Sequence, residues 1–202
     1  MTAPVPAGAF ATLQAFARPR AAVECCELCD TVLDAAHDHL LDREFRLRCT
    51  CFPCGRLMEG AAGWARVHHR VQRLLDFRLS DDGWQALGLP IGLVFFVWSS
   101  AAECAIARYP SAFGPVESSL ALPAWDRLTA ANPVLARLQP DVEALLVNRI
   151  GRRREHYLVS IDVCYRLVGL LRLHWRGFGG GGEVHDRIER FFVDLERAGR
   201  SA

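Results

Sequence analysis

The sequence contains no lysine, and all 24 of its basic residues are arginine. Several catalytic strategies depend on a lysine amine, which forms Schiff bases with carbonyl substrates or holds the phosphates of a nucleotide. Phosphoryl transfer of the kinase type needs the same amine. These three classes of chemistry are therefore excluded for this chain.

A surplus of charge of one sign is also missing, because the 24 arginines stand against 23 acidic residues and the net charge is +1. A dedicated nucleic-acid binder carries an excess of basic residues that neutralises phosphates. The remaining composition, 51% hydrophobic and 23% charged, is that of an ordinary globular protein. The chain is therefore not expected to bind nucleic acid.

The sequence lacks a recognisable export signal. Residues 1–17 are rich in Ala and Pro, have no positive charge before Arg18 and contain no uninterrupted apolar stretch, so they do not match a secretory signal. We expect residues 1–21 to form a flexible leader and the protein to be cytoplasmic. In a reducing compartment the eight cysteines are expected to be metal ligands or buried thiols rather than disulfides.

A long apolar segment is found at residues 87–107. Its length of about 20 residues would suffice to cross a bilayer. Pro90, two serines and Glu103 interrupt it, however, and its centre is rich in β-branched and aromatic residues. These features predict a buried β-hairpin over residues 91–109 and argue against a membrane span.

Cysteine is abundant in one place, since six of the eight cysteines lie within a stretch of 30 residues. They include two Cys-x-x-Cys pairs, Cys26 with Cys29 and Cys51 with Cys54. Two thiolates three positions apart can point at one ion from a single tight turn, and two such turns complete a tetrahedron. Gly55 can adopt the left-handed conformation after the second pair. This spacing predicts a metal site on the four cysteines, with zinc as the expected ion.

Further potential ligands lie close to these pairs, namely His37, His39 and Cys49. In an extended segment the two histidines face the same side. A single zinc could be held by the four paired cysteines, or by three thiolates and one imidazole. Nearly all of the candidates could instead serve two ions, and four cysteines could hold an iron–sulfur cluster. The sequence leaves these possibilities open.

The distribution of apolar residues predicts two parts and the α+β class. Residues 22–60 contain too few apolar side chains for a core of their own, so we expect a small zinc-ribbon-like Cys/His module that folds around its metal. Residues 61–202 have the pattern of a larger mixed α+β domain. This domain is expected to end in two helices joined by a glycine-rich hinge at residues 179–182.

Hydrophobic periodicity and turn residues predict the elements of the larger domain. Besides the hairpin, the expected strands are residues 67–71, 74–79 and 156–161. The expected helices are residues 123–131, 162–177 with Asp162 as N-cap, and 183–197. Asp81-Asp82-Gly83 is expected to form a turn and residues 109–115 a rigid loop. The pattern of residues 141–150 fits a helix and a strand equally well.

No set of side chains with catalytic spacing is evident. Asp162, Cys164 and Tyr165 lie near a helix start, where the helix dipole could activate a thiol. Cys164 falls on the apolar face of that helix, however, and is expected to be buried in the core. His68 and His69 are expected at the surface. An enzymatic role is therefore the least favoured of the functions considered.

Distinctive strings occur throughout residues 24–197: Cys26-Glu27-Leu28-Cys29, His37-Asp38-His39-Leu40, Cys49-Thr50-Cys51-Phe52-Pro53-Cys54, Tyr109-Pro110-Ser111, Pro140-Asp141-Val142-Glu143-Ala144-Leu145-Leu146, Ile161-Asp162-Val163-Cys164-Tyr165-Arg166-Leu167-Val168-Gly169 and Trp175-Arg176-Gly177. They resemble an uncharacterised bacterial protein family of unknown function. Genes of this family are often found beside those of nickel–iron hydrogenases. The resemblance therefore implies an accessory, maturation or electron-transfer role near a hydrogenase, and it implies no catalytic residue.

Together these observations predict a zinc-binding accessory protein that acts through protein–protein contact, with hydrogenase subunits as the implied partner. The alternative is an iron–sulfur protein that transfers electrons or delivers clusters in a hydrogenase system, with the same cysteines as ligands.

Overall fold

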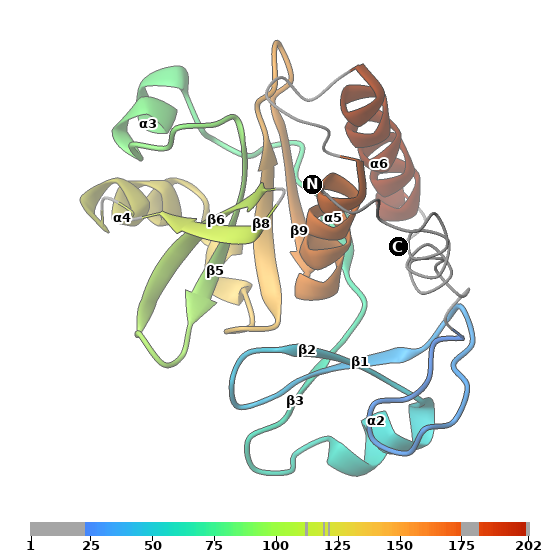
Figure 1. Cartoon of the computed structure of the whole chain (residues 1–202). Helices are drawn as coiled ribbons and strands as arrows, with labels where there is room; N and C mark the ends of the chain where they lie inside the picture. Colours follow the sequence, from blue (N-terminus) through green and yellow to red (C-terminus); the bar gives the residue numbers. More distant parts are fainter. Residues whose placement is uncertain (1–22, 112, 119, 121, 175–181, 201–202) are drawn as a thin grey trace, which may run out of the picture.

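The computed structural model describes residues 23–111, 113–118, 120, 122–174 and 182–200. These residues form two antiparallel sheets, five α-helices and one 3-10 helix. Helices and strands follow one another in mixed order, which confirms the predicted α+β class. The smaller sheet lies beside the larger, helix-covered sheet (Figure 1).

The larger sheet has six strands in the order β4-β9-β8-β5-β6-β7. Every neighbouring pair is antiparallel. The strands are β4 (Val71–Arg73), β5 (Leu93–Ser99), β6 (Cys104–Ser111), β7 (Gly114–Ser118), β8 (Glu143–Asn148) and β9 (Glu155–Ser160).

The apolar segment at residues 87–107 contributes the predicted hairpin, formed by β5 and β6. Among the described residues, no helix combines the length and the apolar character needed to cross a membrane. The ambiguous segment at residues 141–150 is strand β8, and all six of its residues are buried between neighbouring strands. The loop expected at residues 109–115 is instead a second hairpin, in which Pro110 lies opposite Pro115.

Helices cover both faces of the large sheet because its buried strands are apolar on both sides. Phe95 and Val97 face one core, which also contains side chains of α5 (Ile161–His174) and α6 (Gly182–Arg200). Val94 and Phe96 face the other. That core is closed by α3, α4 and the 3-10 helix η1, which are Asp81–Ala86, Leu122–Ala131 and Pro133–Arg137 (Figure 1).

Several predicted boundaries were wrong. Helix α5 begins at Ile161, so Asp162 lies in its first turn rather than at its N-cap. Asp81-Asp82-Gly83 is not a turn but the start of α3, where the Ser80 hydroxyl accepts the Gly83 N–H at 3.0 Å. Helix α6 begins at Gly182, the last residue of the predicted hinge; residues 179–181 lie outside the described residues.

The smaller sheet has the strand order β2-β1-β3. Its strands are β1 (Asp38–Leu41), β2 (Leu47–Thr50) and β3 (Ala65–Val67), and the short helix α2 (Phe52–Met58) follows β2. Because β3 pairs with β1, this sheet includes residues beyond position 60. Leu41 and Val67 are buried in the core under α5 and α6, so the small sheet packs against the larger domain.

The segment at residues 67–71, which was predicted as one strand, instead connects the two sheets. Residues 67–71 were predicted as continuous, but Val67 ends β3 and Val71 begins β4. Between them, Arg70 donates two hydrogen bonds to the buried Glu143 carboxylate, at 2.9 and 3.0 Å. The strand predicted at residues 74–79 is not formed; β4 ends at Arg73.

Candidate metal centre

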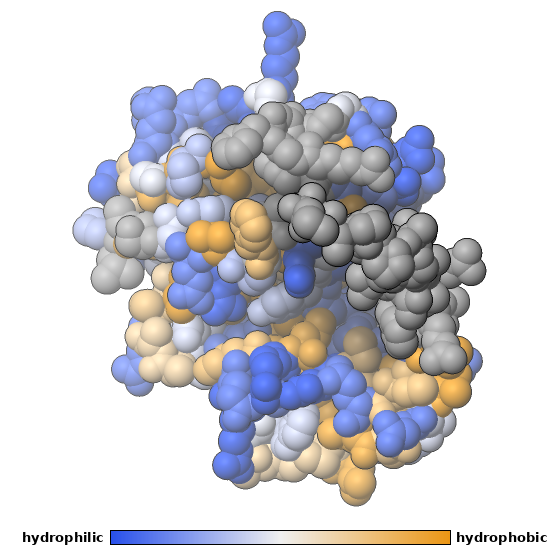
Figure 2. All heavy atoms as spheres, in the orientation of Figure 1, coloured by the Kyte–Doolittle hydropathy of each residue, from blue (hydrophilic) through white to orange (hydrophobic). Residues whose placement is uncertain are grey.

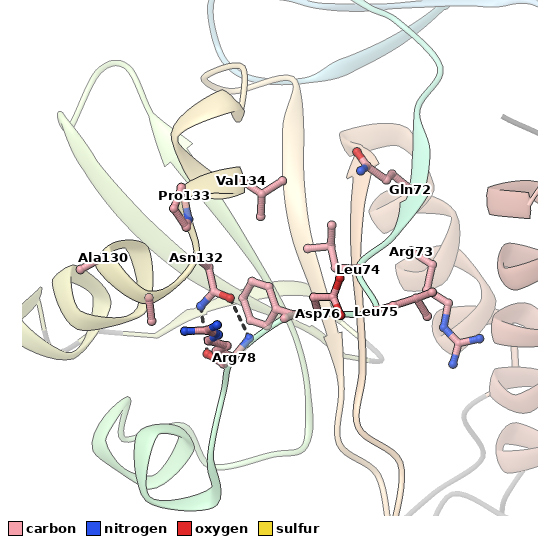
Figure 3. Close-up of a pocket in the computed structure, with 12 residues that line it drawn as sticks. Gln72, Arg73, Leu74, Leu75, Asp76, Arg78, Ala130, Asn132, Pro133 and Val134 are labelled. Carbon is pink, nitrogen blue, oxygen red and sulfur yellow. Dashed lines mark hydrogen bonds between the residues drawn. The ribbon is translucent and has the colours of Figure 1, made fainter.

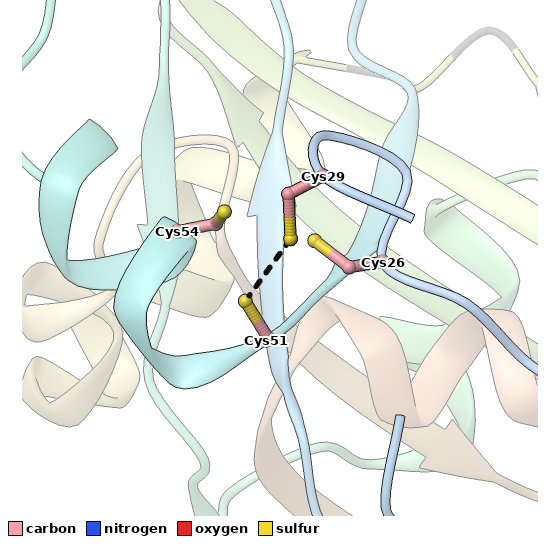
Figure 4. Close-up of side chains that lie close together, drawn as sticks. All are labelled: Cys26, Cys29, Cys51 and Cys54. Carbon is pink, nitrogen blue, oxygen red and sulfur yellow. Dashed lines mark hydrogen bonds between the residues drawn. The ribbon is translucent and has the colours of Figure 1, made fainter. Parts of the chain in front are cut away.

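The first cysteine pair lies in a tight turn that precedes the small sheet. The Cys26 N–H donates to the Thr31 carbonyl at 2.7 Å, and the Asp30 N–H donates to the Cys26 carbonyl at 2.9 Å. Asp30 has a positive φ of 59°, a conformation that Asp tolerates better than most residues. These bonds bring the side chains of Cys26 and Cys29 to the same side of the turn (Figure 4).

The second pair lies at the start of α2. Cys51 occupies the N-cap position and Cys54 lies in the first turn, so three-residue spacing places both side chains on one side of the helix start. Gly55 has a helical φ, which corrects the expected left-handed conformation. Its missing side chain has another purpose, because a Cβ at this position would lie only 2.8 Å from the Cβ of Asp38.

The four sulfurs converge. The Sγ atoms of the two pairs all lie within 4.8 Å of one another, and those of Cys29 and Cys51 are 3.6 Å apart (Figure 4). A zinc ion with Zn–S bonds of about 2.3 Å has tetrahedral S···S edges of about 3.8 Å. The four cysteines could therefore hold one metal ion with little movement.

Without a cation the four thiols titrate very differently. Hydrogen bonding by the Thr31 hydroxyl, and by neighbouring groups, lowers the pKa of Cys29 to about 6. Hydrogen bonds from the Cys54 thiol to Cys29 and Cys51 raise the pKa of Cys54 to about 12. Adjacent thiolates repel one another, so all four ionise together only when a cation occupies the centre.

A polar network holds the first turn against the small sheet. The Glu27 carboxylate accepts the Cys49 N–H at 2.9 Å and pairs with Arg48 at 2.8 Å. Arg48 also donates to Asp42 at 3.0 Å. Burial would raise the pKa of Asp42, but the Arg46 backbone N–H and both guanidinium groups outweigh this effect and lower the pKa to about 2. The Asp42 carboxylate is therefore ionised in the folded protein at neutral pH.

The close approach at Gly55 leads to a prediction about stability. Gly55→Ala should destabilise the protein by about 1–3 kcal/mol, because the added methyl must displace Asp38. Asp38 accepts a hydrogen bond from Arg66 at 2.8 Å, which the displacement would disturb. Gly169→Ala in α5 is the matched control: its methyl would meet no atom within 4 Å. The control should stabilise by about 0.5–1 kcal/mol.

Urea unfolding, followed by circular dichroism, compares the two alanine variants with the wild type. Effects of the same sign would contradict the proposed close approach.

The other predicted ligands form a second group. His39 lies directly opposite Cys49 in the β1–β2 pairing, and the His37 and His39 ring centroids are 4.8 Å apart. One ligand atom from each of His37, His39 and Cys49 lies within 4.8 Å of the other two. Burial lowers the pKa of His39 and raises that of Cys49. Cys25 is exposed and belongs to neither group.

Sequence reasoning did not associate Asp162 with these residues. Its Oδ2 lies 3.6 Å from His39 Nδ1. Asp162 belongs to α5, which packs on the larger sheet, whereas His39 belongs to β1 of the smaller sheet. A residue so far along the chain has no local spacing signal, and its position at a helix start favoured a capping role.

The remaining candidates lie outside both ligand groups. Cys164 is fully buried, and burial raises the pKa of its thiol well above the usual value. His68 and His69 are exposed, as predicted.

A hollow of about 690 Å³ lies between residues 72–78 and the end of α4 (Figure 3). The Asn132 amide in this hollow accepts the Arg78 backbone N–H at 2.7 Å and donates to the Arg78 carbonyl at 2.9 Å.

One comparison with known proteins gives a match, and that match covers almost the whole chain. No curated protein and no solved structure matches it. A family model, described as "Family of unknown function (DUF5947)", matches residues 25–199. This range includes both cysteine pairs, the second ligand group and both sheets. The chain therefore belongs to the family of unknown function DUF5947.

Proposed function

We propose that this protein binds one zinc ion through Cys26, Cys29, Cys51 and Cys54 and that this ion is structural. The observation that carries the proposal is the convergence of four sulfurs from two turns to within 4.8 Å of one another. Four thiolates complete a tetrahedron and leave no position for a substrate, which is the pattern of closed zinc sites.

The spacing of the sulfurs also favours one ion over a cluster. In a cluster with several irons, cysteines bound to different iron atoms stand farther apart than cysteines around a single ion, whereas here all four sulfurs lie within 4.8 Å of one another. The 3.6 Å between Cys29 and Cys51 is close to the tetrahedral edge of about 3.8 Å expected for zinc. An iron–sulfur electron carrier is therefore the weaker proposal.

We further propose that the protein acts as a cytoplasmic accessory factor through contact with another protein. Large apolar side chains are exposed around the cysteine pairs: Val23, Leu28, Val32, Phe52 and Leu57. Apolar surface is visible over this part of the molecule (Figure 2). Exposed apolar groups gathered in one region favour a protein partner. Genes of the uncharacterised family that the sequence resembles are often found beside hydrogenase genes, which suggests hydrogenase subunits as the partner. Co-purification with these subunits tests that choice.

Metal analysis of the protein purified without oxygen tests the central proposal. We expect at least one tightly held zinc per chain and no visible absorption, because Zn²⁺ has a filled d shell. X-ray absorption should show Zn–S scattering at about 2.3 Å. A brown protein that contains iron and labile sulfide would overturn the zinc assignment and support the electron-transfer alternative.

A further inference from the structure

We propose that His37, His39 and Cys49 bind a second divalent metal ion, separate from the four-cysteine site, and that Asp162 positions His39 for it. The proposal is independent of the structural zinc, because none of these residues belongs to the four-cysteine group.

Strand pairing brings the three ligands together. His39 on β1 and Cys49 on β2 are direct partners in an antiparallel ladder, so their side chains project from the same face. His37 precedes His39 by two residues and shares that face. One ligand atom from each of the three residues lies within 4.8 Å of the others, a span that a single ion can bridge.

The hydrogen bonding of His37 leaves one nitrogen for a metal. Its Nδ1 lies 2.9 Å from the Asp34 carbonyl, which can only accept, so Nδ1 carries the proton. Nε2 is then an acceptor, and it is buried without a hydrogen-bond partner. Buried polar atoms are almost always paired, so an isolated one calls for a missing partner. A metal ion bound to Nε2 would supply that partner.

Asp162 extends the site into the larger domain. Its Oδ2 is 3.6 Å from His39 Nδ1, and its Oδ1 is buried without a hydrogen-bond partner. Metal-binding histidines commonly donate their second ring N–H to a carboxylate, which fixes the ring orientation. In this arrangement Nδ1 of His39 faces Asp162 and Nε2 is the metal ligand. Asp162 is therefore a positioning residue.

The ligand set indicates both the kind of ion and the kind of site. Two imidazoles and one thiolate suit borderline cations such as Zn²⁺, Ni²⁺ or Co²⁺ rather than Mg²⁺ or Ca²⁺. Three protein ligands leave a fourth tetrahedral position for water or an external ligand, as in open zinc sites. All three side chains are partly exposed. With three protein ligands instead of four, the second ion is expected to exchange more readily than the first.

Metal titration of the full-length protein tests the second site. The metal-free chain should take up about two Zn²⁺ ions, the weaker of which is lost in the double variant His37→Ala/His39→Ala. X-ray absorption of the loaded wild type should show Zn–N or Zn–O scattering at about 2.0–2.1 Å besides Zn–S at about 2.3 Å. The double variant should show sulfur alone, which also demonstrates that its four-cysteine site has remained intact.

Three further variants complete the test. Asp162→Asn removes no ligand. It should lower the affinity for the second ion about 10–100-fold and leave the affinity for the first ion unchanged. His69→Ala and Cys25→Ser, which remove an exposed imidazole and an exposed thiol, should leave both ions in place. A wild type that binds one Zn²⁺ in a purely sulfur shell, or a double variant that still binds two, would overturn the proposal.

Discussion

Cys54→Ser should abolish zinc binding at the proposed four-cysteine site and unfold the small sheet. Serine is a poor zinc ligand, so three thiolates would remain where four converge within 4.8 Å. Binding of a structural zinc contributes about 10–16 kcal/mol in small zinc domains. The small sheet has few buried apolar side chains with which to replace that contribution: Leu40, Leu41 and Val67. We therefore expect zinc content to fall to near zero after dialysis.

The larger domain should survive this change in weakened form. Leu41 and Val67 belong to its core, and their exposure would cost about 1.5–3 kcal/mol each. The core on the other side of the sheet contains no residue of the small sheet.

Hydrogen exchange measures both parts of this expectation. Protection should disappear from β1, β2 and β3 and remain in β8 and β9. Cys25→Ser is the matched control, since its thiol is exposed and lies outside both ligand groups. Retention of zinc together with protection in Cys54→Ser would remove this residue from the ligand set.

Zinc binding at the four-cysteine site should release between two and three protons at pH 7. All four ligands must be thiolates in the complex. In the metal-free protein Cys29, with a pKa of about 6, is already mostly ionised. Cys54, with a pKa of about 12, is protonated, and the pKa of Cys51 is also raised. The pKa of Cys26 is lowered from 9.0, so its thiol contributes at most one proton.

The sign of the pH dependence follows from this proton release. Acid favours the protonated, metal-free thiols, so zinc affinity falls as pH falls. Two to three protons per ion correspond to a loss of about 100- to 1,000-fold in affinity as the pH falls from 7 to the Cys29 pKa of about 6. Above the pKa of Cys29 the dependence should be shallower than the fourth-power dependence of four ordinary thiols.

Calorimetric titration in buffers with different ionisation enthalpies counts the released protons. The Cys49→Ser variant should be used, because it removes the thiol that a second ion would deprotonate. Release of four protons would show that Cys29 is not preferentially ionised, and release of none would argue against thiolate ligation.

Much of the larger domain could be predicted from sequence, because its signals are local. The hairpin of β5 and β6 follows from β-branched and aromatic residues interrupted by a turn, and α4 follows from Pro123 and the stop at Asn132-Pro133. Errors occurred where a local preference competed with packing. Residues 141–150 fitted two periods, and burial between β5 and β9 decided for a strand.

The boundaries of the small sheet were harder to predict for the same reason. Nothing in the sequence near Val67 indicates that it pairs with His39 rather than continuing toward Val71. Long-range strand pairing depends on which residues the folded core brings together, and periodicity does not report it.

The sequence by itself determined the chemistry of the candidate metal centre. Cys-x-x-Cys and His-x-His spacings place ligand atoms within one turn or on one strand face, so they act locally. Only the tertiary structure decided how the ligands divide into two groups, the four cysteines and the set of His37, His39 and Cys49. Pairing of β1 with β2 sets His39 opposite Cys49, and the packing of α5 brings Asp162 to 3.6 Å from His39. These contacts join residues that are distant along the chain, so they exist only once both sheets have formed and packed together.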